Sequence, residues 1–222
     1  MNPPITHIIY DNDGLLLDTE PLYTKAHEVV AARYGKVFDW NVKSKMIGLR
    51  AEDSAQVMID ALQLPLTVPQ YLEARRPLLV ELFPQSEPLP GAVALTMHLH
   101  RAGIPQAVAT SSDRYHLELK ITNHRDWFEI FECLVVGDDP EIKRGKPAPD
   151  IFLVAAKRLH ADPAHCLVFE DSPAGVEAAR RAGMSVIAVP DPHMDDAEYR
   201  GAHQIIRNLN EVDLASWGLP PL

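Results

Sequence analysis

Short apolar runs alternate with helical patterns along most of the chain. Between the apolar runs, hydrophobic residues recur at helical spacing, most clearly over Gly91–Ala102, Pro149–Leu159 and Pro173–Ala182. Alternation of this kind predicts an α/β protein, a doubly wound parallel sheet with helices on both faces. The runs with the length and composition of buried strands are Ile5–Tyr10, Ile104–Ala109, Cys133–Val136, His165–Phe169, Ser185–Val189 and Gln204–Ile206.

One long segment interrupts this alternation. From residue 20 to residue 88 the pattern is helical, with turn residues at Gly35, Gly48 and Pro65 and no convincing strand. Proline-containing stretches bound the segment at both ends. We therefore predict an all-helical insertion over residues 20–88, placed after the first strand. Residues 1–19 and 89–222 would then form one Rossmann-like α/β core.

Composition and charge narrow the class of partner. The chain of 222 residues has a formal net charge of -10, so we expect no nucleic-acid partner. The sequence contains no run of about 18 apolar residues, so we expect no membrane-spanning helix. The N-terminus has no signal-peptide pattern. Cys133 and Cys166 lie in predicted strands, where buried free thiols are expected. We expect a cytoplasmic protein, and a monomer, since nothing in the sequence indicates an assembly.

Polar and charged residues stand where four predicted strands end. Asp11 and Asp13 follow the first strand, and Thr110-Ser111-Ser112 follow the second. The loop after the third strand contains Lys146, and the fourth strand ends in Glu170-Asp171. Ligands of open parallel sheets bind at the carboxyl ends of the strands, so these groups are expected to meet.

This set of groups has the chemistry of phosphoryl transfer. Clustered carboxylates need a cation, and oxygen ligands of this kind suit Mg²⁺. A lysine and a hydroxyl can hold phosphate oxygens. One Asp can attack phosphorus, while an Asp two residues further on can protonate the leaving group and then activate water. The sequence therefore predicts a phosphorylated substrate, which the resemblance described next narrows to a small phosphorylated metabolite.

The motifs resemble those of the haloacid dehalogenase-like (HAD) phosphohydrolase superfamily in type, order and spacing. They are Asp11-x-Asp13-Gly14, the Thr110 strand end, Lys146 in Gly-Lys-Pro-x-Pro-Asp, and Glu170-Asp171. The resemblance implies a mobile helical cap after the first strand, Mg²⁺ and an aspartyl-phosphate intermediate. It further implies the following roles: Asp11 as nucleophile, Asp13 as acid/base, Thr110, Ser111 and Lys146 as phosphate ligands, and Asp11, the Asp13 carbonyl, Asp171 and Glu170 around the metal.

Further segments resemble two groups of phosphatases within that superfamily, the pseudouridine-5′-phosphatases and the plant glycerol-phosphate phosphatases. The shared segments include Gly14–Glu20, Phe38–Trp40 and Trp217–Pro220. They do not separate the two activities, so either monoester remains a candidate substrate. The candidate specificity positions in the insertion are Tyr23, His27, Lys45, Met46, Arg50 and Asp53.

Two alternatives stay open. A sugar-phosphate mutase of the β-phosphoglucomutase type shares these motifs, but that branch has His where this chain has Tyr23, and a cap Arg where it has Ala51. Arg50 could replace that arginine through a one-residue shift. The second alternative is a binding protein that has lost turnover, which only Asn12 supports. An apolar residue is usual between the two aspartates, and a buried amide needs hydrogen-bond partners.

Overall fold

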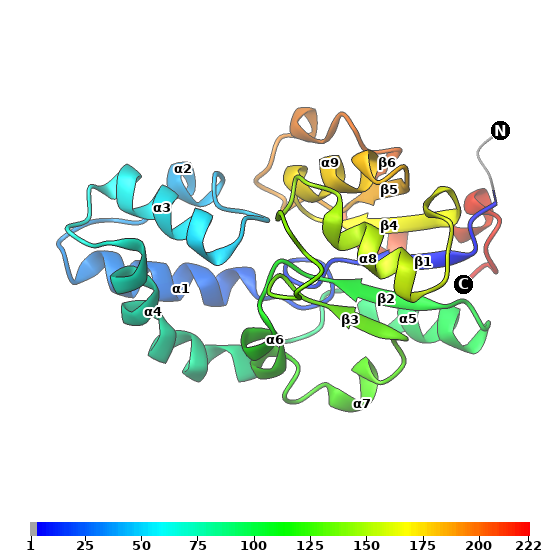
Figure 1. The fold of residues 1–222 in the computed structure, drawn as a ribbon, viewed down its shortest axis with the longest axis horizontal. Helices are drawn as coiled ribbons and strands as arrows, with labels where there is room; N and C mark the ends of the chain where they lie inside the picture. Colours follow the sequence, from blue (N-terminus) through cyan, green and yellow to red (C-terminus); the bar gives the residue numbers. More distant parts are fainter. Residues whose placement is uncertain (1–3) are drawn as a thin grey trace.

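The structure, a computed structural model, describes residues 4–222 and contains one parallel sheet (Figure 1). Its six strands follow the order β3-β2-β1-β4-β5-β6, with β1 at the centre beside β2 and β4. The doubly wound α/β fold predicted from the sequence is therefore confirmed. The strands are β1 (His7–Tyr10), β2 (Gln106–Ala109), β3 (Cys133–Val135), β4 (Cys166–Glu170), β5 (Ser185–Ala188) and β6 (Gln204–Ile205).

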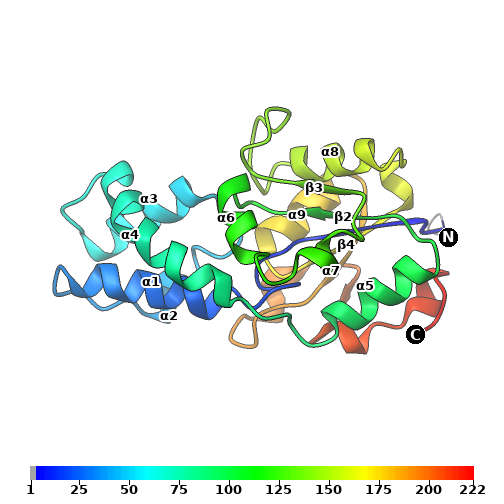
Figure 2. The ribbon, with the colours of Figure 1, turned by 90° about the horizontal axis from the view of Figure 1, so that it is seen from below.

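Helices pack on both faces of the sheet because successive strand residues point to opposite sides. Ile8 and Tyr10 of β1 pack with helices α5 (Ala92–Arg101), α6 (Arg114–Lys120) and α7 (Arg125–Phe128). Ile9, between them, belongs to the opposite layer with α8 (Asp150–Arg158) and α9 (Pro173–Arg181). The two layers are seen in Figures 1 and 2.

Two strands begin two residues later than the apolar pattern predicts. The paired strands begin at His7 and Gln106, whereas the apolar runs begin at Ile5 and Ile104. Ile5 is buried and Ile104 half-buried, so both contribute to the core without joining the ladder. Hydrophobicity marks the buried segment, while the neighbouring strands determine where pairing starts.

A group of helices lies apart from the sheet, away from the C-terminus (Figure 1). It comprises α1 (Glu20–Ala32), α2 (Trp40–Lys43), α3 (Ala51–Leu62) and α4 (Val68–Leu82). These helices enclose an apolar cluster of their own that includes Val30, Met58 and Tyr71, all fully buried. We call residues 20–88 the helical insertion. That the insertion is a separate folding domain remains a prediction.

The two connections between the insertion and the sheet lie side by side. Leu17 and Pro88 form an isolated antiparallel bridge. The amide of Asp18 donates to the carbonyl of Glu87 at 2.8 Å, and the amide of Leu89 donates to that of Leu16 at 2.9 Å. The helices are thus joined to the core through one paired two-chain connection.

Two other sequence predictions concern membranes and thiols. Within residues 4–222, no helix combines the length and the apolar character needed to cross a bilayer. Cys133 and Cys166 are both free, but only Cys166 is buried. Cys133 is a free thiol as predicted, but it is half-buried and not buried, because it lies in the outermost strand β3.

Candidate active site

A tight turn after β1 holds the two motif aspartates. The amide of Asp13 donates to Oδ2 of Asp11 at 2.8 Å, and the amides of Leu16 and Leu17 donate to the carbonyl of Asn12. Gly14 continues the turn with a φ of +79°. A Cβ at this position would lie 2.5 Å from Oδ2 of Asp171, so the turn reaches the β4 edge only with glycine.

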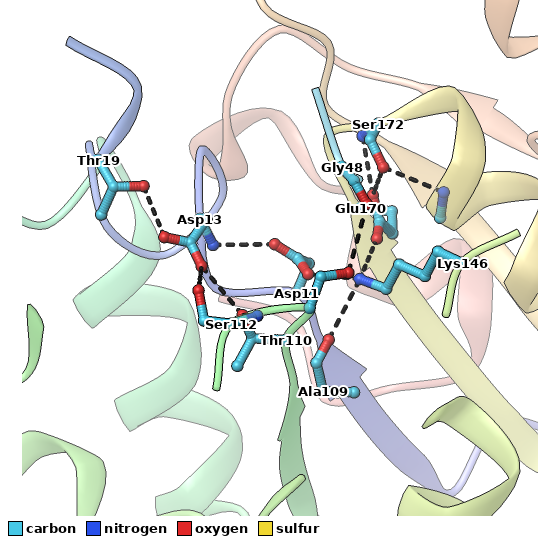
Figure 3. Close-up of polar contacts among 12 residues, drawn as sticks. Asp11, Asp13, Thr19, Gly48, Ala109, Thr110, Ser112, Lys146, Glu170 and Ser172 are labelled. Carbon is cyan, nitrogen blue, oxygen red and sulfur yellow. Dashed lines mark hydrogen bonds and ion pairs between the residues drawn. The ribbon is translucent and has the colours of Figure 1, made fainter. Parts of the chain in front are cut away.

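Lys146 joins the ends of β1 and β4 (Figure 3). Its Nζ donates to Oδ1 of Asp11 and to Oε1 of Glu170, both at 2.5 Å, and to the carbonyl of Ala109 at 3.2 Å. The other carboxylate oxygen of Glu170 accepts from the amide and hydroxyl of Ser172. Glu170 therefore orients the lysine. Burial would lower the pKa of Lys146, but Asp11 and Glu170 raise it, so the ammonium stays charged.

Three buried carboxylates meet around one lysine. Oxygens of Asp11, Glu170 and Asp171 lie within 4.8 Å of one another. Burial raises the pKa of Asp11, an effect that Lys146 opposes and Glu170 reinforces. Burial, Glu170 and Asp11 together raise the pKa of Asp171. One ammonium does not balance three carboxylates, so this donor set fits a hard divalent cation such as Mg²⁺.

Asp13 faces a different set of partners (Figure 3). Thr19 donates to Oδ1 at 2.8 Å, while Thr110 and Ser112 donate to Oδ2 at 2.9 and 3.0 Å. Lys120, fully buried at the end of α6, forms an ion pair with Oδ1. Burial would raise the pKa of Asp13, but Lys120 and the hydroxyl donors outweigh it and lower the pKa to about 2. Asp13 is therefore ionised at neutral pH.

The site residues selected from the sequence lie together at the carboxyl-terminal edge of the sheet, and two of their hydroxyl groups make specific contacts. The Thr110 hydroxyl donates to Asp13, and the Ser111 hydroxyl donates to the carbonyl of Gly48 in the insertion at 3.3 Å. The Asp13 side chain lies outside the three-carboxylate cluster. Lys120 was not predicted, because a lysine ending an amphipathic helix normally looks like a solvated residue. Its only signal was the apolar neighbourhood of α6.

A cavity separates this edge from the helical insertion. Tyr23, His27 and Met46 line it as the sequence suggested, whereas Lys45 and Asp53 are exposed and do not. The side chain of Arg50 lies against Gly145 instead of lining the cavity. Insertion side chains that line it without having been predicted are Glu20, Thr24, Phe38, Lys43, Ile47, Leu49, Ala51, Ser54, Arg75 and Leu79.

Asn12, between the two aspartates, is fully buried. Neither its Oδ1 nor its Nδ2 has a hydrogen-bond partner among the described residues 4–222. It is absent from the residues that line the cavity. Its cost is therefore one of stability, since a buried amide without partners loses its interactions with water.

Comparisons with known proteins agree with this geometry. A family model described as haloacid dehalogenase-like hydrolase matches residues 5–183. The (DL)-glycerol-3-phosphatase 2 of Arabidopsis thaliana is 46% identical, over 98% of this chain and 92% of that protein. The "Probable pseudouridine-5′-phosphatase" of Drosophila melanogaster is 42% identical, over 97% of this chain and 95% of that protein. The solved structure of CbbY from Rhodobacter sphaeroides in complex with phosphate has a TM-score of 0.80 at 26% identity, covering 97% and 100% of the two chains.

The fold and the family match together define a hydrolase with an α/β core. The chain belongs to the haloacid dehalogenase-like hydrolases. Within that family it is a phosphatase, that is, a phosphoric monoester hydrolase. The two phosphatases named above align with it over 92% and 95% of their own lengths. The resemblance inferred from the motifs is thereby confirmed.

Proposed function

We propose that the protein is a Mg²⁺-dependent phosphatase that transfers the phosphoryl group of a small monoester to Asp11 and then to water. Pseudouridine 5′-phosphate and glycerol phosphate are the two substrates that the relatives' names suggest. The observation that carries the proposal is that the two motif aspartates have different partners. Asp11 belongs to the three-carboxylate cluster, while Asp13 has hydroxyl and lysine partners beside the cavity.

In the first step, an oxygen of Asp11 attacks phosphorus and the bond to the ester oxygen breaks. Lys146 donates to the attacking carboxylate and would contact the phosphoryl oxygens. Asp11, Asp171 and Glu170 would hold Mg²⁺ with the Asp13 carbonyl, and the ion would neutralise phosphoryl charge. Thr110 and Ser111 line the same cavity and would contact the phosphoryl oxygens.

Asp13 would move the protons. The approach of a phosphate dianion raises the pKa of a neighbouring carboxylate, so Asp13 can carry a proton when substrate is bound and give it to the leaving alcohol. Asp13 is then ionised and can take a proton from water. The resulting nucleophile attacks phosphorus, the bond to Asp11 breaks, and inorganic phosphate is released. Lys120 stabilises the ionised form that this second step requires.

The helical insertion would act as the cap. Gly48 of the insertion accepts a hydrogen bond from Ser111, so this loop closes over the phosphate side of the cavity. Closure excludes bulk water from the phosphorylated aspartate until the alcohol has left. The mutase alternative has less support, because Arg50 lies against Gly145 and is not among the residues lining the cavity.

The test is release of inorganic phosphate, with Mg²⁺, from pseudouridine 5′-phosphate, uridine 5′-phosphate, glycerol 3-phosphate and β-glucose 1-phosphate. We expect one ester to be strongly preferred. Asp11→Ala should lower kcat by at least about 10³-fold, because the nucleophile is lost. EDTA should abolish turnover, and excess Mg²⁺ should restore it.

Asp138→Asn is the matched control for the acidic residues. Asp138 is exposed in the loop after β3 and accepts from the amide of Arg114, outside the cavity. This variant should keep its activity and its response to EDTA. Wild-type protein that is folded and releases phosphate from none of the esters would overturn the proposal, as would full activity in Asp11→Ala.

A further inference from the structure

Arg75, in helix α4, is a charged side chain without a charged partner. It is 4% exposed and lines the cavity. Among residues 4–222 it forms no ion pair, and its Nε has no hydrogen-bond partner. A guanidinium carries five N–H donors in a rigid fork, so most of its binding capacity is unused.

The neighbours of Arg75 hold the guanidinium without neutralising it. Its Cζ lies 5.8 Å from the ring centre of Tyr23 and 5.9 Å from that of Tyr71. Aromatic faces attract a cation, but they do not accept its N–H groups as an oxygen does. Burial, assisted by Arg75, lowers the pKa of neighbouring His27 to about 3, so this imidazole is neutral and adds no second charge.

The acidic residues of the cavity are engaged elsewhere. Glu20 pairs with Lys43 at 3.3 Å. Asp13 pairs with Lys120, and Asp11 pairs with Lys146. Asp113 is bonded to the amide and ring of His116. None of these carboxylates turns to Arg75, so the protein supplies no anion for a buried charge that would otherwise be costly.

The contacts of Arg75 indicate that it would face the alcohol part of the substrate and not its phosphoryl group. Lys120, which contacts Asp13, donates to the hydroxyl of Tyr23 at 2.9 Å, and Arg75 lies over the same Tyr23 ring. Asp13 is the residue that would protonate the leaving oxygen. In the proposed mechanism, Arg75 would therefore lie beyond the leaving oxygen, on the side of the cavity toward which the alcohol part of the ester extends.

We propose that Arg75 is a specificity-determining residue that binds an acceptor oxygen on the alcohol part of the substrate. This rests on the proposed phosphatase function and narrows its substrate class. The preferred esters are those whose alcohol carries hydroxyl or carbonyl oxygens several atoms from phosphorus. A plain alkyl ester leaves the guanidinium desolvated and unpaired, and is rejected for that reason.

The experiment compares esters that differ in these oxygens. Propyl phosphate and glycerol 3-phosphate have the same carbon chain, and pseudouridine 5′-phosphate carries oxygens further from phosphorus. We expect wild-type kcat/KM to be higher for at least one oxygen-bearing ester than for propyl phosphate. In Arg75→Met that preference should fall by about 10- to 100-fold, because the oxygen-bearing ester loses a charged hydrogen bond while propyl phosphate no longer leaves a guanidinium unpaired. The ester that loses more shows how far from phosphorus the bound oxygen lies.

Two further variants separate recognition from folding. Arg76→Met removes the neighbouring arginine, which is exposed and lies over Tyr115, and should leave the preference intact. Arg75→Lys retains the charge without the fork and should recover part of the preference. Arg75→Met should melt no lower than Arg76→Met, because it removes an unpaired buried charge.

The failure of this inference differs from failure of the proposed function. If wild-type protein hydrolyses no ester, the phosphatase proposal fails. If it hydrolyses all three and Arg75→Met changes their kcat/KM values by the same factor, the phosphatase stands and the role of Arg75 is overturned. A wild-type enzyme that treats propyl phosphate like both oxygen-bearing esters overturns it equally.

Discussion

Two buried lysines give the two motif aspartates different chemistry. Lys146 contacts Asp11 together with Glu170, within a cluster that has an excess of negative charge. Lys120 contacts Asp13, whose remaining partners are hydroxyl groups. Residues two apart in sequence thus have opposite shifts, with the pKa raised at Asp11 and lowered at Asp13. Pairs of this kind are how enzymes assign separate roles to similar groups.

Asn12, which separates these aspartates, is a site where stability can be gained. Its amide is fully buried without partners, so replacing it with an apolar side chain removes a desolvation penalty. We expect Asn12→Leu to raise the free energy of unfolding by about 1–3 kcal/mol, measured by urea denaturation. Phosphatase activity should be retained, because Asn12 does not line the cavity.

The exposed Asn210 provides the comparison for this variant. Asn210→Leu should change the free energy of unfolding by less than about 0.5 kcal/mol. Equal or lower stability in Asn12→Leu would mean that the buried amide has partners in solution.

At the scale of the elements, strand ends were predicted better than the contacts between elements. The carboxyl ends of β1, β2 and β4 carry the residues that the sequence selected, because parallel topology alone brings such ends together. Arg75 and Lys120 were not selected, because their burial depends on how α4 and α6 pack. Lys45 was selected wrongly, since position within the insertion does not determine which face of a segment meets the cavity.

Helix α1 carries a pH-dependent element of the insertion. His27 is buried among aromatic rings, and its Nδ1 is hydrogen-bonded to the hydroxyl of Tyr71. Burial, with Arg75 and Lys43, lowers its pKa from 6.5 to about 3. Between these values the unfolded chain binds a proton that the folded chain does not. Stability contributed by neutral His27 is therefore present above pH 6.5 and is lost as the pH falls towards 3.

We expect this loss to approach about 1 kcal/mol per pH unit below pH 6. His27→Gln keeps a hydrogen-bonding group but cannot titrate, so its free energy of unfolding should fall less steeply between pH 6 and 4. His100→Gln, at an exposed position of α5, should follow the wild type. Parallel pH profiles for wild type and His27→Gln would show that His27 is accessible to protons in the folded state.

For the whole molecule, we expect activity to depend on how the insertion meets the core. The loop before α3 contacts two separate strand ends. The carbonyl of Gly48 accepts from Ser111 after β2, and a Cβ on Gly48 would lie 2.3 Å from the hydroxyl oxygen of Ser172 after β4. Ser172 in turn donates to Glu170, which holds Lys146. A displacement of this loop would therefore change the position of Lys146, which orients Asp11.

Gly48→Ala tests that connection, and Gly35→Ala is its matched control. Both glycines have positive φ, +76° and +66°, so alanine strains the backbone at each by roughly 1–2 kcal/mol. A Cβ on Gly35 meets nothing within 4 Å, whereas a Cβ on Gly48 collides with Ser172. Gly48→Ala should lose at least as much stability as Gly35→Ala, because its Cβ also collides with Ser172. Only Gly48→Ala should lose about 10- to 100-fold in kcat/KM, because misplacement at the site slows the reaction. Equal activity in the two variants would mean that the insertion closes over the site without this close contact.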